Sequence, residues 1–219
     1  MQLSEIRQKV RSLLDDEIGS DSAKYWKDAD LTENINSCVE EFAERTLCIT
    51  DSLSSACLIA LVVGTRHYDL DDSILAIQTV QPSWCDTPLG QTTRITAPSG
   101  WLSAVGPPVS YLLDYSSKKL SLTSAPATVA GETLRLTANR LPASELADDT
   151  DVPEIPRQYH RKLYDGVMAL AYLKQDAETY NPAKSKAHME KWGETMMTAV
   201  RREAMLKPRI IVANRLEMC

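Results

Sequence analysis

The chain has 219 residues and a formal net charge of −6, a length sufficient for a substantial hydrophobic core. Its longest apolar run, residues 57–63, is far too short for a membrane span, so a membrane function is not expected. The five cysteines form no CxxC pair and the first residues have no apolar secretory segment, which favours synthesis in a reducing cytoplasm. Lys and Arg concentrate in residues 184–219, and the acidic remainder argues against binding DNA over the whole surface.

Two amphipathic helices are predicted at the start of the chain. The first covers residues 4–17, where apolar residues share one helical face, and the polar segment after it ends the helix. The second runs from Asp28, as its N-cap, to about Thr46, with apolar residues three or four positions apart. Trp26 precedes it and is placed to cover the end of the apolar stripe. The two helices are expected to form a hairpin.

A β region is predicted from about residue 47, where the apolar spacing shortens toward two. We expect antiparallel hairpins. The candidate strands are residues 58–63, 66–70, 74–80, 109–113, 119–123 and 132–139. Between the two sets, residues 81–108 are dense in Pro and Gly, which indicates a long surface loop. Trp84 and Trp101 lie in this loop and are candidate interface anchors, although burial against their own strands is an equal alternative.

Two further helices are predicted in the last third of the chain. An acidic linker after Arg140 leads to Pro153 and Pro156, which favour an extended approach and a helix start at or just after Pro156. That helix would span about 24 residues, or roughly 36 Å. Asn181 is a suitable N-cap and Pro182 a suitable first residue for the next helix, which should end near residue 206.

This order of elements predicts an α+β fold. The helix pairs in residues 1–46 and 153–206 would pack into one bundle, and residues 47–152 would form a β-rich insertion with the long loop and the acidic linker. Residues 207–219 would form an extended C-terminal arm. The arm is apolar as well as basic and has no obvious partner in its own chain, so it suits attachment to another protein; a frayed terminus is the alternative.

No catalytic constellation is recognisable in the sequence. His67, His160 and His188 have no spacing typical of metal ligands, and the glycine motifs of phosphate-binding loops and of serine hydrolases are absent. We therefore expect no catalytic residue, no metal site and no cofactor. His160, next to Tyr159, is interpreted as a contact residue at a subunit or domain interface rather than as a general base.

Several segments, taken in order, resemble one family: the head-to-tail adaptor proteins of tailed bacteriophages, also called connector or head completion proteins. The similar segments are LSEIRQKVRSLLDD, YWKDADLTENINSCVEEFAERT, GTRHYDLDDSILAIQTVQ, GPPVSYLLDYSSKKLSLTSAPATVAGETLRLTANRLPAS and VPEIPRQYHRKLYDGVMALAYLKQDAETYNPAKSKAHMEKW. Together they cover nearly the whole chain. One departure is Asp71, in a turn where proline is common in the family, and it leaves the geometry of that turn open.

The resemblance implies a structural virion protein without enzymatic activity, located at the head–tail junction. It would assemble with itself as a dodecameric ring under the portal protein, extend the channel through which double-stranded DNA passes, and carry a tail or nozzle component. The bundle would form the ring wall, and Trp84, Trp101, Tyr159 and His160 are candidate contacts to a neighbouring subunit or the tail. The resemblance assigns portal binding to these residues of the arm: Lys207, Pro208, Arg209, Ile210, Ile211, Val212, Asn214, Arg215, Leu216 and Met218.

Two alternative functions remain open at this point. A tail-completion or tube-terminator protein would have the same layout of helices around a β insertion. A nucleic-acid-processing accessory protein is suggested only by the basic last fifth of the chain.

Overall fold

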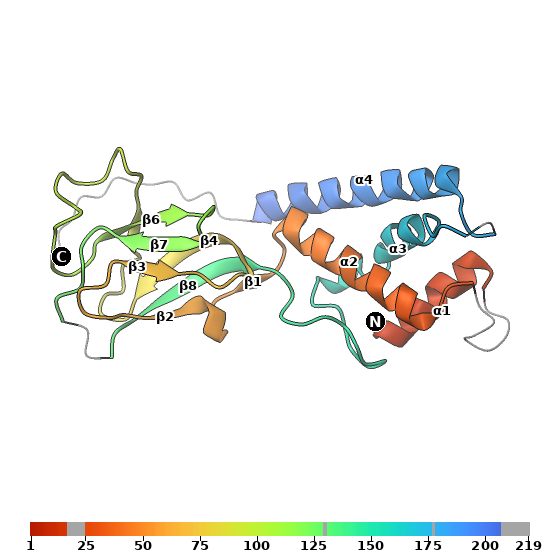
Figure 1. Cartoon of the computed structure of the whole chain (residues 1–219), viewed down its shortest axis with the longest axis horizontal. Helices are drawn as coiled ribbons and strands as arrows, with labels where there is room; N and C mark the ends of the chain where they lie inside the picture. Colours follow the sequence, from red (N-terminus) through yellow and green to blue (C-terminus); the bar gives the residue numbers. More distant parts are fainter. Residues whose placement is uncertain (17–24, 129–130, 177, 207–219) are drawn as a thin grey trace.

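The computed structural model describes residues 1–16, 25–128, 131–176 and 178–206. The molecule is elongated, with the helices gathered at one end and two β-sheets at the other (Figure 1). The α+β class predicted from the sequence is confirmed, since helices occupy both ends of the chain and strands lie between them. The boundaries proposed for the β insertion stay a prediction.

Helices α1 (Leu3–Leu14) and α2 (Asp28–Thr46) form the N-terminal pair. α1 ends earlier than predicted because Asp15 adopts a left-handed conformation (φ 55°) and its backbone N–H donates to the Arg11 carbonyl. The predicted bounds of α2 are confirmed, but its N-cap is Lys27. Asp28 lies instead in the first turn, where a negative charge interacts favourably with the helix dipole.

The prediction of one long helix after Pro156 is wrong. The chain forms a short 3-10 turn, η3 (Arg157–Tyr159), and then the nine-residue helix α3 (Leu163–Ala171). The helix stops because the chain folds back at Tyr172, whose carbonyl accepts a hydrogen bond from the Asn181 N–H at 2.9 Å. The side chain of Asn181 accepts the Lys184 N–H at 3.0 Å and so caps α4 (Pro182–Leu206), as predicted.

The N-terminal and C-terminal helices pack around one hydrophobic core. The ring of Trp192 on α4 is 1 % exposed, and its centroid lies 5.5 Å from that of Phe42 on α2. Its indole Nε1–H donates to Glu41 Oε2 at 3.0 Å, so the buried ring is also satisfied as a donor. Trp26 is buried in the same core, as predicted, and donates to the Ala171 carbonyl at 2.9 Å. The two helix pairs therefore form a single bundle.

The β region consists of two four-stranded sheets. In the first, β1 (Thr50–Asp51), β2 (Leu58–Ala60) and β4 (Ile74–Pro82) all pair antiparallel with β8 (Thr133–Arg140). In the second, β3 (His67–Asp69), β7 (Lys119–Leu122) and β6 (Ser110–Asp114) pair antiparallel, while β5 (Gly90–Gln91) pairs parallel with β6. The short 3-10 turn η2 (Ser55–Cys57) precedes β2. Buried side chains of both sheets form a second hydrophobic core.

The predicted pattern of hairpins is largely wrong. Of the named strand pairs, β6 and β7 form a hairpin, and Lys118 in its turn has a positive φ of 50°. The strands of the first predicted set do not pair with one another; β2 and β4 pair with β8, and β3 pairs with β7. Strand pairing thus connects residues far apart in the sequence.

One arginine links the two parts of the molecule at the end of β8. The Arg140 guanidinium donates to Asp51 Oδ2 at 2.6 Å and to Glu154 Oε2 at 3.0 Å. The Glu154 carboxylate also accepts the Ala143 N–H at 2.9 Å. Arg140 therefore joins β1, β8 and the segment that leads into η3.

Candidate interaction surfaces

Four strongly exposed apolar side chains of the β region lie in the segment between β5 and β6. We call residues 92–109 the apolar loop. Its exposed members are Ile95, Leu102, Val105 and Val109, and Ile95 is 94 % exposed. Exposed apolar side chains that gather in one segment are typical of a surface that binds another protein. These four residues were not singled out from the sequence, where the visible signal was apolar residues inside a stretch dense in Pro and Gly.

Arg66 holds the apolar loop against the second sheet. Its guanidinium donates to the carbonyl oxygens of Trp101, of Ala104 at 3.0 Å and of Thr123 at 3.1 Å. It also lies 5.7 Å from the centroid of the Trp101 ring, within the range of a cation–π interaction. The Ala125 N–H donates to the Ala104 carbonyl at 3.0 Å. These bonds give the loop a defined shape despite its lack of regular structure.

The two loop tryptophans are only partly exposed. Trp84 packs against the core of the β region, and the ring of Trp101 lies under Arg66. Part of each side chain is therefore buried against its own fold, which is the alternative that the sequence left open. Their role as interface anchors stays a prediction.

Tyr159 and His160 lie inside the bundle. The Tyr159 ring lies 4.9 Å from that of Phe42, centroid to centroid. His160 is 2 % exposed, with Nε2 located 2.9 Å from the Ile155 carbonyl and Nδ1 located 3.2 Å from the Met1 amino nitrogen. Both side chains make contacts within the chain and offer little surface to a partner, so an interface role for them also stays a prediction.

We expect His160 to make the fold sensitive to mild acid. Burial lowers the pKa of His160 from its ordinary value of 6.5, and the charges of the N-terminus and Arg157 act in the same direction. The unfolded chain keeps the ordinary pKa and therefore binds more protons, so stability declines as the pH falls through 6.5 toward the lower pKa of the folded state. A His160→Gln variant, whose amide can still donate to Ile155, should lose less stability between about pH 7 and about pH 5.

Urea unfolding at both pH values measures this difference. An equal loss of stability in the variant and in the unaltered chain would show that His160 does not carry the effect.

The residues predicted to form the portal-binding arm, 207–219, lie outside the described residues. Among the residues that are described, no three His, Cys, Asp or Glu side chains are arranged to hold a metal ion. None of the described helices combines the length and the apolar character needed to cross a membrane.

An elongated chain with a helical bundle at one end and an ordered, exposed apolar loop at the other has the form of a structural interaction protein (Figure 1). The sequence matches the family model described as SU10 adaptor protein over residues 1–212, and the chain therefore belongs to the SU10 adaptor protein family. The predicted resemblance to phage head-to-tail adaptors is confirmed, and the protein is a structural phage adaptor of the virion. A comparison with curated proteins finds no match.

Proposed function

We propose that this adaptor binds under the portal protein at the head–tail junction as a dodecameric ring, extends the DNA channel and carries a tail or nozzle component. The observation that carries the proposal is the separation of the apolar loop from the helical bundle along an elongated molecule (Figure 1). An adaptor has to contact two different partners, and two distant ends can do so at the same time.

Each partner has a proposed contact in the chain. The bundle forms the ring wall, residues 207–219 attach to the portal, and the apolar loop faces the tail component. The net charge of −6 supports a channel that does not retain DNA, since a wall rich in cations would bind the phosphates and slow their passage.

Deleting residues 207–219 is expected to abolish attachment to portal-bearing heads and to leave the fold intact. The described bundle core is built without these residues, and chain ends that contribute little to a core can be removed at low cost. Co-sedimentation with purified heads measures attachment, and circular dichroism checks the fold.

A variant of the apolar loop is the counterpart of the truncated chain, because it should affect the other partner. A chain with Ile95→Ser, Leu102→Ser and Val105→Ser should still bind heads, but should join tails about 10- to 100-fold less efficiently, because apolar anchors carry much of the energy of an interface. Normal head attachment by the truncated chain would exclude the proposed role of the arm. Normal tail joining by the loop variant would exclude the proposed role of the loop.

A further inference from the structure

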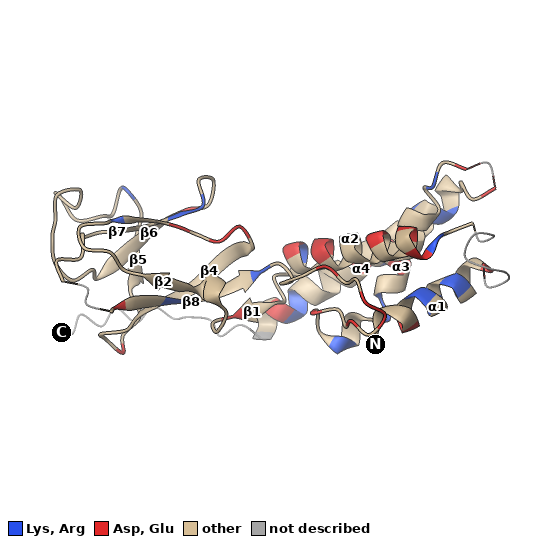
Figure 2. Ribbon diagram, turned by 60° about the horizontal axis from the view of Figure 1, so that its bottom comes forward, with Lys and Arg blue, Asp and Glu red and all other residues tan. Residues whose placement is uncertain are grey.

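Two helices of the bundle carry rows of polar side chains with the same spacing and opposite charge. On α4, the basic row consists of Lys191, Thr195, Thr198 and Arg202. On α2, the acidic row consists of Glu33, Ser37, Glu40 and Glu44. Both rows step by four, three and four residues, so each follows one helix face for about 16 Å. Figure 2 shows Asp and Glu recurring along α2.

Both rows are accessible. All four side chains of the acidic row are exposed, because they lie opposite the face of α2 that buries Leu31, Ile35 and Phe42 in the core. In the basic row, Lys191, Thr198 and Arg202 are exposed and Thr195 is partly exposed.

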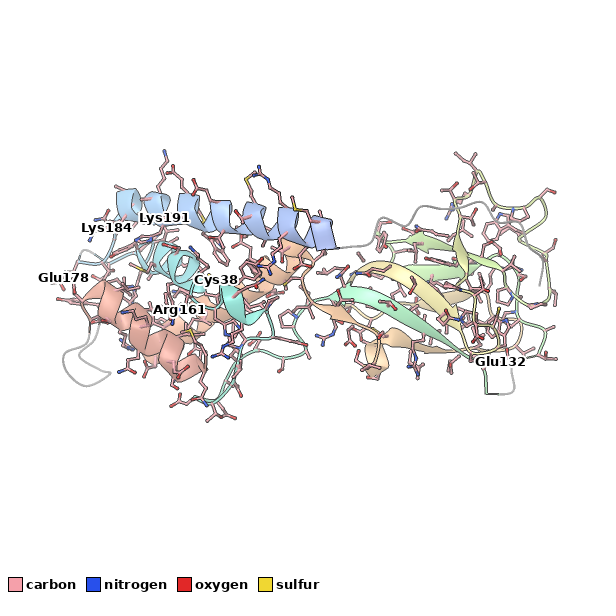
Figure 3. All side chains as sticks on the ribbon, turned by 180° about the vertical axis from the view of Figure 1, so that it is seen from behind. Cys38, Glu132, Arg161, Glu178, Lys184 and Lys191 are labelled. Carbon is pink, nitrogen blue, oxygen red and sulfur yellow. The ribbon has the colours of Figure 1, made fainter. Side chains whose placement is uncertain are left out.

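The basic row forms one wall of a groove. The groove has a volume of about 430 Å³, and its other wall comes from η3, the residues after it and α3, including Tyr159, Lys162 and Asp165. In Figure 3, Lys191 lies on the side of α4 toward α3. Lys162 adds a third cation to the groove. Two acidic residues also line it: Glu194, and Asp165, which is already bonded to His188 Nδ1 at 2.9 Å.

Several polar groups in the groove lack a partner. Among the described residues, none of the cations Lys162, Lys191 and Arg202 forms an ion pair. Tyr159 is 7 % exposed, and its hydroxyl is buried without a hydrogen-bond partner in the part of the chain that the structure describes. A buried hydroxyl with no partner is unfavourable, so an acceptor supplied by a docked partner would stabilise the Tyr159 side chain.

The acidic row lacks partners in the same way. Within the described part of the chain, Glu33, Glu40 and Glu44 form no ion pairs. Glu33 and Glu44 lie 11 residues apart on α2, and Lys191 and Arg202 lie 11 residues apart on α4, so the outer charges of the two rows have the same separation.

We infer that the acidic row of one copy docks into the groove beside the basic row of the next copy. This inference rests on the proposed ring, because it names the surfaces that join its subunits. Contact between two different patches of the same chain is heterologous, and it generates a closed ring when the rotation between copies closes. No other chain is needed to supply the complementary charge.

The directions of the helices agree with this contact. α2 and α4 run the same way, and each ends beside the β region (Figure 1). Copies related by rotation about an axis along the bundle keep the direction of their helices, so the inferred contact pairs Lys191 with Glu33 of the next copy and Arg202 with its Glu44. Exposed ion pairs are individually weak and are screened by salt, so the contact should be reversible and strongest at low ionic strength.

Charge reversal in two separate chains tests the inference. The first chain carries Lys191→Glu and Arg202→Glu, and the second carries Glu33→Lys and Glu44→Lys. Each alone places like charges across the contact and should self-associate roughly 10- to 100-fold more weakly than the unaltered chain at low salt. A mixture of the two should regain association, because every contact then joins opposite charges. Analytical ultracentrifugation of the purified chains, without heads or tails, measures their self-association.

A chain with Lys186→Glu and Arg201→Glu is the control, since it has the same change in net charge on α4 residues that do not line the groove. It should associate like the unaltered chain. The inference is overturned if the unaltered chain does not self-associate at low salt, if the mixture fails to recover, or if the control weakens as much. It is also overturned if the first chain keeps self-association and loses only retention by duplex DNA. Failure of head attachment, by contrast, would affect only the proposed function.

Discussion

Replacing Arg140 with alanine is expected to lower the free energy of unfolding by about 3 kcal/mol, the lower end of the range for breaking a buried ion pair. The Arg140 side chain is 11 % exposed and contacts the carboxylates of Asp51 and Glu154. Without the guanidinium, two carboxylates remain at the junction and the Asp51 side chain stays largely buried (12 % exposed). The loss should also loosen the attachment of the β region to the bundle.

Urea unfolding at neutral pH measures this effect. Arg135 lies on the same strand, β8, and is exposed, so Arg135→Ala is the matched control and should change stability by no more than about 0.5 kcal/mol. If the two alanine variants had the same stability, the Arg140 contacts would be of no energetic importance.

A Gly166→Val substitution in α3 should destabilise the bundle by about 3 kcal/mol, the upper range for overpacking a core. A Cβ atom at this position would lie 2.9 Å from Cys38 Sγ and 3.0 Å from Cε2 of Trp192. Cys38 is short and the indole is rigid, so neither can move aside without shifting a helix; Figure 3 shows Cys38 in the interior of the bundle. The clash exceeds the gain in helix propensity, which is less than about 1 kcal/mol.

Gly193 on α4 is the control for this substitution. A Cβ atom there would meet no atom within 4 Å, so Gly193→Ala should stabilise the chain by about 0.5 to 1 kcal/mol through helix propensity alone. Thermal unfolding of both variants separates packing from propensity. A Gly166→Val variant as stable as the unaltered chain would contradict the close approach of α2, α3 and α4.

These two positions bear on function because an adaptor that contacts two partners has to hold its two ends in a defined relative position. Gly166 sets how closely the helices of the bundle approach, and Arg140 sets how the β region is joined to them. A variant that folds but loses either contact would carry the apolar loop in a less defined position relative to the bundle.

Local features were predicted well from the sequence. The bounds of α2 follow from apolar residues at helical spacing, and the N-cap at Asn181 was recognised from its residue type and the proline after it. The strand β8 was recognised within one residue at each end because Leu134, Leu136 and Ala138 alternate with less buried residues. Each of these signals lies within a few residues of the element it defines.

The sequence did not show how far the candidate surface residues are covered by the fold. Trp84 and Trp101 were chosen because large aromatic rings often anchor interfaces, yet both rings are partly covered by their own fold. The exposure of the apolar loop is a property of the tertiary structure, in which Arg66 binds backbone carbonyls of the loop and of Thr123. The correspondence between the acidic row on α2 and the basic row on α4 depends on which faces of the two helices are exposed, and the tertiary structure decides this.

The sequence by itself determined the family, the α+β class and the order of helix pair, strands and helix pair, because residue spacing reports which face of an element is buried. The tertiary structure alone decided that α3 stops at Ala171, that β8 pairs with three strands, and that Tyr159 and His160 are internal. Those outcomes depend on contacts between residues far apart in the chain, such as the bond from Asn181 to Tyr172 and the pairing of β4 with β8, and no local pattern specifies them.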